Sequence, residues 1–307
     1  MLRVFEISRM TNKNGPGIRT LVHFKGCPLR CKWCSTPESQ KVEFELQYKS
    51  VRCIGCGACL KACPEGAISP SENPDEKMFV DRNKCIQCFD CVEGCYSHAL
   101  HKVGSDWSKE DLFKEICKDE VFFQTSGGGV TFSGGEPLMN VDDEMTDLYR
   151  MIFEKGISIG VDTTGYVPWS NIEKVLPYID FFLWDIKVMD SAKHKMYTGV
   201  GNELILENLK KVEEFSEKYH TKVYIRCVQV PGMTDYDENL RETCEFLRGM
   251  SCVKELDILN FHHYGEKRYA ALGRPYFVKG LEKLNDETLL RKKRLVEEYG
   301  IICKLSN

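Results

Sequence analysis

The cysteines of this chain are concentrated in its first third, where they form ordered groups instead of a scatter. Of sixteen cysteines in 307 residues, eleven lie within the first hundred positions. The groups are Cys27, Cys31 and Cys34; Cys53, Cys56, Cys59 and Cys63; and Cys85, Cys88, Cys91 and Cys95. Any fold must hold each group together, so iron–sulfur chemistry is the first hypothesis to consider.

The second and third groups share the spacing C-x2-C-x2-C-x3-C, which is typical of ferredoxin units with two 4Fe-4S clusters. In such units, three cysteines of one run and the fourth cysteine of the other run hold a cluster together. The predicted sets are Cys53, Cys56, Cys59 and Cys95 for one cluster, and Cys63, Cys85, Cys88 and Cys91 for the other. The small residues Gly55, Gly57 and Ala58 suit the tight turns that such a cluster needs.

Two other uses of these cysteines are weaker. Structural zinc also favours C-x2-C pairs, but a zinc site needs only four ligands, and two copies of one longer run favour clusters. Disulfides are disfavoured because we expect no secretory leader, since the start MLRVFEISRM is short and polar.

The first group, Cys27, Cys31 and Cys34, has the spacing C-x3-C-x2-C and offers no fourth cysteine. A 4Fe-4S cluster held by three thiolates keeps one iron open to an outside ligand. An open coordination position is what separates metal centres that activate small molecules from purely structural ones. This group is therefore the predicted catalytic centre.

Four motifs in order carry a family resemblance. They are NGPGIRT (14–20), GCPLRCKWC (26–34), the paired cysteine runs, and SGGEP (133–137). The three-cysteine motif, with Trp33 before its last cysteine, resembles that of the radical S-adenosylmethionine (SAM) enzymes. The full set resembles the activating enzymes of glycyl radical enzymes, and it extends over essentially the whole chain.

The resemblance implies an oxidoreductase that cleaves SAM reductively to a deoxyadenosyl radical. That radical abstracts a hydrogen atom from the Cα of one glycine in a partner glycyl radical enzyme. SAM and three 4Fe-4S clusters are the implied cofactors, and a monovalent cation is a further candidate. A flavodoxin or ferredoxin would supply electrons, which the insert clusters would relay unless they only shape a docking surface. The insert favours activators of dehydratases, lyases and decarboxylases over the compact activator of pyruvate formate-lyase.

The same resemblance assigns SAM contacts near the ends of several strands. The assigned residues are Trp33, Gly134, Gly135, Glu136, Asp162, Thr163, Asp185, Lys187, Arg226 and His262. Trp33 would pack on the adenine, and Lys187 would lie near the carboxylate of SAM. His262, and not its neighbour His263, would lie near the adenosine.

The resemblance also makes Asp162, Thr163 and Asp185 candidates for the cation site, and oxygen ligands of this kind suit hard cations. Arg226 alternates with the inward positions of its strand, and a buried guanidinium needs an anionic partner. Read without the family, strand-end residues of these types are more often helix caps or solvated charges.

The segment before the first cysteine group is the predicted contact for the glycine-bearing loop of the partner. Its residues are Asn14, Gly15, Pro16, Gly17 and Arg19. The Gly-Pro-Gly sequence is also a rigid turn by itself. Most relatives carry Asp where this chain has Asn14, so a role that needs a carboxylate at that position is in doubt.

Secondary-structure patterns place a strand at 20–25, then an insert, and afterwards alternating strands and helices. The predicted strands are 129–134, 158–165, 179–187, 222–232 and 255–261. The predicted helices are 108–123 with Ser108 as its cap, 142–154, one opened by the capping box Ser170 to Glu173, 203–219, 237–248 and 286–299.

Repeated strand–helix units demand a parallel sheet with right-handed crossovers. About six such units are present, fewer than the eight that close a full barrel. We therefore expect an α/β fold in which residues 1–46 and 104–307 form a partial (β/α)6 radical SAM barrel. Residues 47–103 would be an inserted ferredoxin-like domain with two 4Fe-4S clusters.

Composition argues against nucleic-acid-binding and membrane proteins. The net charge of −4, with basic residues spread along the chain, disfavours a nucleic-acid partner. No apolar run is long enough to cross a membrane, so we expect a cytoplasmic protein, and a monomer because the partner must reach the mouth. The cysteines outside the groups are expected to be buried small side chains: Cys117, Cys227, Cys244, Cys252 and Cys303.

Two alternatives to an activating enzyme stay open. A radical SAM enzyme acting on a small molecule or a ribosomal peptide often has further clusters near its C-terminus, and this chain has no cysteine group after Cys95. An electron-transfer ferredoxin fused to an inert barrel would need no three-cysteine site.

Overall fold

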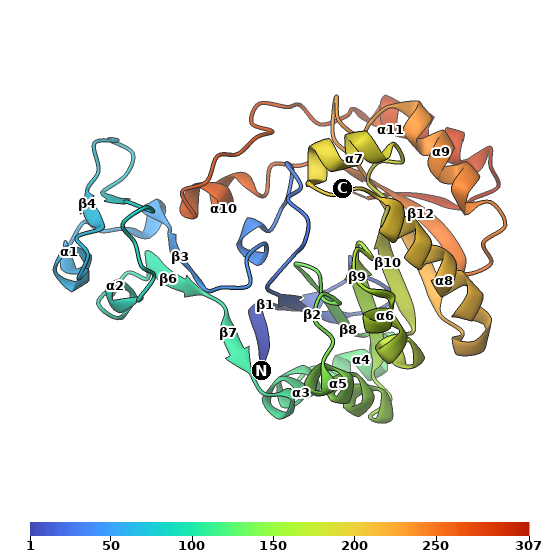
Figure 1. Ribbon diagram of the computed structural model, residues 1–307, viewed down its shortest axis with the longest axis horizontal. Coiled ribbons are helices and arrows are strands. Elements are labelled where there is room, and N and C mark those ends of the chain that lie inside the picture. The colour runs from blue at the N-terminus through green and yellow to red at the C-terminus, as the bar shows by residue number, and fades with distance from the viewer. Residues whose placement is uncertain (307) are drawn as a thin grey trace.

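The computed structural model describes residues 1–306 and has two parts, a main α/β body and a small lobe that projects from one end of it (Figure 1). One sheet forms the centre of the body. Its strands within residues 1–306 are β1 (Leu2–Thr11), β2 (Arg19–Phe24), β7 (Ser105–Trp107), β8 (Gly129–Gly134), β9 (Ser158–Thr163), β10 (Phe181–Asp185), β11 (Lys222–Gln229), β12 (Val253–Asn260) and β13 (Cys303–Ser306). Their spatial order is β13-β12-β11-β10-β9-β8-β2-β1-β7.

Strands β2 and β8 to β13 all run parallel, whereas β1 pairs antiparallel with β2 and β7. The segments between successive parallel strands contain helices, which confirms the predicted α/β alternation and its count of about six units. The helices of the body are α3 (Lys109–Cys117), α4 (Glu120–Ser126), α5 (Asp143–Glu154), α6 (Trp169–Val175), α7 (Ser191–Thr198), α8 (Glu203–Tyr219), α9 (Asp237–Leu247), α10 (Glu266–Ala271) and α11 (Asp286–Glu297). Short 3-10 turns lie at Pro37–Ser39 and Leu176–Tyr178.

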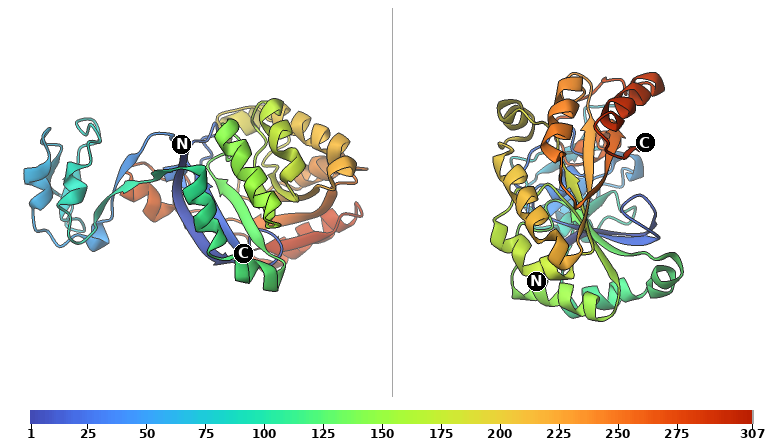
Figure 2. Two further views of the ribbon diagram at one scale, coloured as in Figure 1. Left: turned by 90° about the horizontal axis from the view of Figure 1, so that it is seen from below. Right: turned by 90° about the vertical axis from the view of Figure 1, so that its right-hand side faces the viewer.

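The two faces of the sheet differ in chemistry because side chains alternate along each strand. On β11, Val223, Ile225 and Cys227 are buried in the apolar core between the sheet and the helices. Tyr224 and Arg226 lie on the opposite, inner face, which is only partly buried. Most of the long helices cover the outer side of the curved sheet (Figure 2).

The lobe has a core of its own. Its elements are β3 (Glu45–Tyr48), a 3-10 turn (Ser50–Arg52), α1 (Ala58–Ala62), β4 (Ile68–Pro70), β5 (Met78–Val80), α2 (Asp90–Glu93) and β6 (Leu100–Val103). β3 pairs with β6, and β4 pairs with β5. Leu46, Ile68, Met78 and Leu100 pack there with cysteines of both runs, separately from the core of the body.

Two predicted helices differ from the observed ones. The helix expected at 108–123 is divided into α3 and α4, because Asp119 leaves helical geometry to accept hydrogen bonds from Thr20 and Arg9 on the first two strands. The predicted Ser108 cap is confirmed, since its hydroxyl accepts from the Asp111 amide at 3.1 Å. The capping box at Ser170 is wrong: α6 begins at Trp169, two residues earlier than that cap implies, and has no side-chain cap.

Five helices and strands of the body were not predicted. β1, β7 and β13 are strands at or next to the edges of the sheet, and α7 and α10 are short helices of eight and six residues. No helix in residues 1–306 is long and apolar enough to span a membrane. Of the isolated cysteines, Cys227, Cys244, Cys252 and Cys303 are buried as predicted, whereas Cys117 is only partly buried.

Arg19 at the start of β2 is the most deeply buried charge on the inner face, with no exposed surface. Its guanidinium donates to Thr131 Oγ1 at 2.7 Å, and to the carbonyls of Pro16, Val130 and Ser158 at 3.1, 2.6 and 2.9 Å. Burial lowers the pKa of Arg19 to about 10, so it stays charged at neutral pH. This side chain joins the loop before β2 to strands β8 and β9.

We predict that Arg19→Met lowers the free energy of unfolding by about 3 kcal/mol, because buried carbonyls would lose a charged donor. Anaerobic urea denaturation of the cluster-loaded protein measures this change. Arg248→Met is the matched control, because the Arg248 side chain is 69% exposed. An equal effect of both substitutions would contradict the role of Arg19.

Candidate functional site

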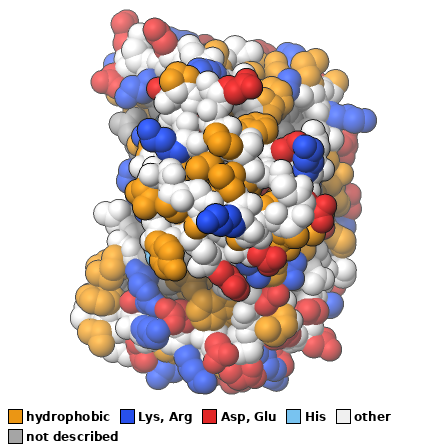
Figure 3. All heavy atoms as spheres, turned by 90° about the vertical axis from the view of Figure 1, so that its left-hand side faces the viewer, with side chains coloured by type: hydrophobic (Ala, Val, Ile, Leu, Met, Phe, Trp, Pro, Cys, Tyr) orange, Lys and Arg blue, Asp and Glu red, His pale blue; other side chains and the backbone are white. Residues whose placement is uncertain are grey.

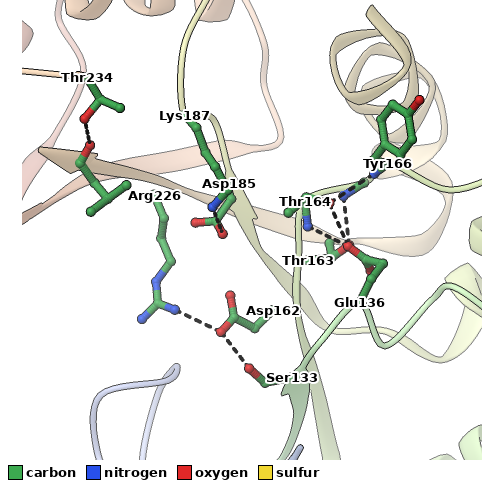
Figure 4. Close-up of polar contacts among 12 residues, drawn as sticks. Ser133, Glu136, Asp162, Thr163, Thr164, Tyr166, Asp185, Lys187, Arg226 and Thr234 are labelled. Atoms are coloured by element: carbon green, nitrogen blue, oxygen red, sulfur yellow. Dashed lines mark hydrogen bonds and ion pairs between the residues drawn. The ribbon is translucent and has the colours of Figure 1, made fainter. Parts of the chain in front are cut away.

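The candidate site lies where β8, β9 and β10 end, at the edge of the sheet from which the first cysteine loop also leaves β2 (Figure 4). Parallel strands bring their carboxyl ends to one edge of a sheet, which is where α/β proteins bind ligands. The SGGEP turn follows β8, the Asp162–Gly165 turn follows β9, and Asp185 and Lys187 follow on β10.

The loop that carries Cys27, Cys31 and Cys34 is held by backbone hydrogen bonds. Gly26 N and Cys27 N donate to the carbonyls of Ser39 and Gln40 at 2.7 and 3.1 Å. The amides of Arg30 and Lys32 donate to the carbonyls at the end of α7. Burial raises the pKa of the Cys31 thiol to about 12, so it would persist as a thiolate at neutral pH only when bound to metal.

Gly134 and Gly135 bring the SGGEP turn directly against that loop. Gly135 N donates to Phe24 O at 2.9 Å, and Glu136 N donates to Gly26 O at 2.8 Å. A Cβ at Gly135 would lie 2.1 Å from Gly26 O, and Gly134 has a φ of +103°. The two glycines therefore set the position of the cysteine loop, a role that the sequence did not indicate; their contact with SAM stays a prediction.

Glu136 is 2% exposed, and its carboxylate is surrounded by donors. Oε1 accepts from Thr163 Oγ1 at 2.5 Å and from Leu138 N at 3.3 Å. Oε2 accepts from Thr164 N at 2.9 Å and Thr164 Oγ1 at 2.8 Å. Glu136 thus ties the end of β8 to the end of β9, as Figure 4 shows. The two carboxylate oxygens already accept four hydrogen bonds, so an amino group of SAM would have to share them.

Asp162 and Arg226 form an ion pair on the inner face. Arg226 Nη1 lies 3.1 Å from Asp162 Oδ2, which also accepts from Ser133 Oγ at 2.9 Å. Arg226 Nη2 donates to the carbonyl of Lys13 at 3.1 Å. Burial acts to lower the pKa of Arg226, but Asp162 and the other nearby carboxylates outweigh it and raise the pKa. The anionic partner expected for Arg226 is therefore Asp162 in this structure.

Lys187 and Asp185 pair next to the first cysteine loop. Lys187 Nζ lies 2.7 Å from Asp185 Oδ2, and the lysine side chain is 9% exposed. Burial acts to lower the pKa of Lys187, but Asp185 and the nearby Cys31 raise it above its ordinary value. A buried, charged ammonium beside the three cysteines can accept an anionic ligand such as a carboxylate.

Trp33 and His262 lie in the loops that border this edge. Trp33 is 8% exposed and packs with Val230 and Phe261. His262 stacks on Tyr264 with ring centroids 4.0 Å apart. His263 instead contacts Leu281 O at 2.7 Å and Tyr276 Oη at 3.3 Å. The assignment of His262 to the adenosine stays a prediction.

The predicted partner-contact segment lies against the inner face. Asn14 O accepts from Thr131 Oγ1 at 2.8 Å. A Cβ at Gly15 would meet the Phe181 ring at 2.2 Å, and one at Gly17 would meet the Gly128 backbone at 2.4 Å. Arg19 differs from the other residues of the predicted set, because its side chain is fully buried in this structure and positions the segment from inside.

Two hollows in the lobe, each of about 320 Å³ including space open to solvent, are lined by the two predicted cysteine sets. The first hollow contains Cys53, Cys56, Cys59 and Cys95, and the second contains Cys63, Cys85, Cys88 and Cys91. In each hollow the fourth cysteine comes from the other run, as ferredoxin ligand sharing requires. The residues present therefore fit two clusters.

The two runs also repeat in backbone conformation. Gly55, Gly57 and Gly66 have positive φ values of 74°, 72° and 58°. Their counterparts 32 positions later, Gln87, Phe89 and His98, have φ values of 58°, 69° and 51° without being glycines. Glycine content indicated the turns of the first run, and only the repeat itself could have indicated those of the second.

Sequence reasoning missed three residues that the structure places around the site. Thr164 and Ser133 lie inside the motifs DTTG and SGGEP, so their position beside assigned residues was the available signal. Tyr269 on α10 had no signal. Burial, and then the proximity of Cys34 and Cys31, raise the pKa of Tyr269.

Comparisons with known proteins agree with this geometry. A 4Fe-4S dicluster domain model matches residues 52–99, and a 4Fe-4S single cluster domain model matches residues 82–206. The chain is 36% identical to the indoleacetate decarboxylase activating enzyme of Tractidigestivibacter scatoligenes, over 98% of this chain and 96% of that protein. It is 38% identical to the trans-4-hydroxy-L-proline dehydratase activating enzyme of Clostridioides difficile, over 98% of both.

Among solved structures, a radical SAM methyltransferase from Sphaerobacter thermophilus is similar in fold, with a TM-score of 0.50 at 14% identity, covering 72% of this chain and 62% of that one. The near-full-length similarity to the two relatives decides the family. The chain belongs to the glycyl radical enzyme activating enzymes.

We predict that Glu136→Gln lowers the free energy of unfolding by about 1–3 kcal/mol, because one oxygen that accepts hydrogen bonds would become a donor. It should also weaken SAM binding by about tenfold, equivalent to about 1.4 kcal/mol, because the turn would shift. Urea denaturation and calorimetric titration measure both effects. Glu173→Gln is the control, since Glu173 is exposed on α6; unchanged values for Glu136→Gln would overturn its positioning role.

Double cysteine variants test the crossed ligand sets. Cys53→Ser/Cys95→Ser removes two ligands of the first hollow and should lose roughly four iron atoms per chain. Cys53→Ser/Cys63→Ser removes one ligand from each hollow and should lose roughly eight. Iron analysis after anaerobic reconstitution measures this difference, and the reverse order of losses would show that each run holds its own cluster.

Proposed function

We propose that Cys27, Cys31 and Cys34 hold the 4Fe-4S cluster at which this activating enzyme binds SAM. When bound, the cluster and SAM supply a deoxyadenosyl radical, which removes a hydrogen atom from the Cα of a glycine in the partner enzyme. The observation that carries this proposal is the convergence of the three-cysteine loop, the SGGEP turn and the Asp185–Lys187 pair at one edge of the sheet.

The side chains around the loop have distinct proposed roles. Lys187 offers a buried positive charge to the SAM carboxylate, and Trp33 and His262 border the adenosine. Gly134 and Gly135 offer main-chain groups to the amino group, while Glu136 fixes their turn. Because these groups are positioned by packing before any ligand arrives, little reorganisation is needed on binding.

The inner face of the sheet is the proposed path of the glycine-bearing loop of the partner. Residues 13–17 lie along this face, joined to it where Arg226 donates to Lys13 O and Thr131 donates to Asn14 O. Asp162, Thr163 and Asp185 are the proposed oxygen donors to a monovalent cation. Asp162 would then exchange part of its contact with Arg226 for the ion. An open (β/α)6 barrel formed by residues 1–46 and 104–307 would leave room for the loop.

The lobe, residues 47–103, is the proposed ferredoxin-like domain with two further 4Fe-4S clusters. The two hollows and the dicluster family match support this assignment. We propose that these clusters relay electrons from a flavodoxin or ferredoxin, in a cytoplasmic protein that acts as a monomer.

The proposed partner is a glycyl radical decarboxylase, dehydratase or lyase, because the relatives that are similar over nearly their whole length activate a decarboxylase and a dehydratase. Reduced protein, SAM and candidate partners mixed anaerobically should give the doublet of a glycyl radical in electron paramagnetic resonance. A partner labelled with α-deuterated glycine should transfer deuterium to deoxyadenosine.

The Cys34→Ser variant, which lacks one cluster ligand, is the control and should give neither signal. Deoxyadenosine formed without a glycyl doublet in any plausible partner would contradict this function and favour a small-molecule or peptide substrate.

A further inference from the structure

The segment that precedes β2 is held against the inner face through the carbonyl oxygens of its main chain. Side chains from three different strands donate to three of these oxygens. The pairs are Arg226 Nη2 to Lys13 O at 3.1 Å, Thr131 Oγ1 to Asn14 O at 2.8 Å, and Arg19 Nη1 to Pro16 O at 3.1 Å. The position of the segment therefore depends on the position of these three donors.

Arg226 differs from the other two donors because it also pairs with a carboxylate. Its Nη1 lies 3.1 Å from Asp162 Oδ2, which accepts a further hydrogen bond from Ser133 Oγ at 2.9 Å (Figure 4). Arg19 instead donates to Thr131 Oγ1 and to main-chain carbonyls, and it makes no ion pair within residues 1–306. Of the three donors, Arg226 is thus the one that responds directly to charge at the strand ends.

The surroundings of Arg226 make that response strong. The Arg226 side chain is 13% exposed and that of Asp162 is 16% exposed, so water screens the pair poorly. Burial acts to lower the pKa of the guanidinium, and the carboxylates of Asp162, Asp185 and Asp257 outweigh it and raise that pKa. Asp185 is itself paired with Lys187. Asp162 is therefore the carboxylate in direct contact with Arg226 that a bound cation would compete for.

The shape of the guanidinium links its two contacts. Its terminal nitrogens are fixed in one plane, so the group cannot turn away from Asp162 without changing its distance and angle to Lys13 O. A cation that takes an oxygen of Asp162 also repels the positive guanidinium. Both effects weaken the hydrogen bond from Arg226 to Lys13 O.

Lys13 also lies close to the other side of the candidate SAM site. Burial lowers the pKa of His262, and the neighbouring His263 and Lys13 lower it further, which places Lys13 near this histidine. His262 is the residue proposed to border the adenosine. The partner-contact segment thus begins between Arg226 and the proposed adenosine position.

We propose that Arg226 couples the SAM site to the partner-contact segment. A cation held at Asp162 beside bound SAM weakens the hold of Arg226 on Lys13 O and frees residues 13–17 to receive the glycine-bearing loop. The coupling rests on the proposed function, which places SAM at the strand ends and the partner loop along the inner face. Such coupling is reciprocal, so a bound partner loop strengthens SAM and cation binding by the same factor.

Tryptic cleavage after Lys13 measures this hold directly, because the carbonyl that Arg226 contacts belongs to the bond that trypsin cleaves. Lys13 is exposed, and the cleavage rate follows the population in which the segment is released. Lys77, exposed in the turn between β4 and β5 of the lobe, is the internal reference. Figure 3 looks at the lobe end, where lysine and arginine side chains are exposed among acidic and apolar ones. Mass spectrometry of the fragments gives the ratio of the two rates.

In the cluster-loaded protein, kept anaerobic, SAM with potassium chloride should raise the ratio about fivefold over choline chloride of equal ionic strength. Arg226→Gln should raise the ratio by a similar factor without ligand, and SAM with potassium chloride should then change it less than about 1.5-fold. Arg226→Lys keeps the charge but lacks the planar fork, so it should lose the response as well.

Thr131→Val is the matched control, because it frees the neighbouring carbonyl of Asn14 and removes no contact with a carboxylate. It should raise the ratio and keep the response to ligand. The coupling is overturned by a ratio that ligand leaves unchanged or lowers in the original protein, by a response that persists in both Arg226 variants, or by an unliganded Arg226→Gln ratio equal to the original. Calorimetric titration separates the two proposals: SAM that does not bind the cluster-loaded protein contradicts the proposed function, whereas SAM that binds without changing the ratio contradicts the coupling alone.

Discussion

The close packing of the SGGEP turn against the first cysteine loop is the constraint on which the candidate site depends. Two amides of the turn donate to carbonyls of Phe24 and Gly26, and the absence of a side chain at Gly135 makes that approach possible. Glu136 then extends the same arrangement to the end of β9. The cysteines, the turn and the later strand ends are thus positioned by one continuous set of contacts, so a displacement at any one of them is transmitted to the others.

The features that could be predicted from sequence are those that depend on residues close together in the chain. The cysteine spacings, the SGGEP and DTTG motifs and the alternation of strands and helices each depend on neighbours in the chain, and the α/β fold followed from them. The break at Asp119 could not be predicted, because it comes from hydrogen bonds to Thr20 and Arg9, about a hundred residues earlier. The burial of Arg19 likewise depends on strands that follow the lobe. Tyr269 approaches Cys34 only through the tertiary fold.

Buried arginines on the inner face of the sheet donate to main-chain carbonyls. Arg19 and Arg226 both donate to backbone carbonyls of the segment 13–16, so that segment is held by cations and not by apolar packing alone. Arg226 is also paired with Asp162, and a ligand that attracts Asp162 would change the hold of Arg226 on Lys13 O. The proposed SAM site and the proposed path of the partner loop therefore share the contacts of Arg226.

The two cysteine runs of the lobe share positive φ values at matching positions but differ in the residues that adopt them. Where the first run has Gly55 and Gly57, the second has Gln87 and Phe89, and both of these side chains make contacts. Gln87 Oε1 accepts a hydrogen bond from Leu46 N at 3.3 Å. The Lys102 ammonium lies over the Phe89 ring, 5.5 Å from its centroid. Each non-glycine residue in this conformation is strained by roughly 1 kcal/mol or more, which those attachments offset. The halves are consequently not interchangeable: placing the first sequence at the second position would keep every sulfur but lose the contacts that Gln87 makes with β3 and Phe89 makes with β6.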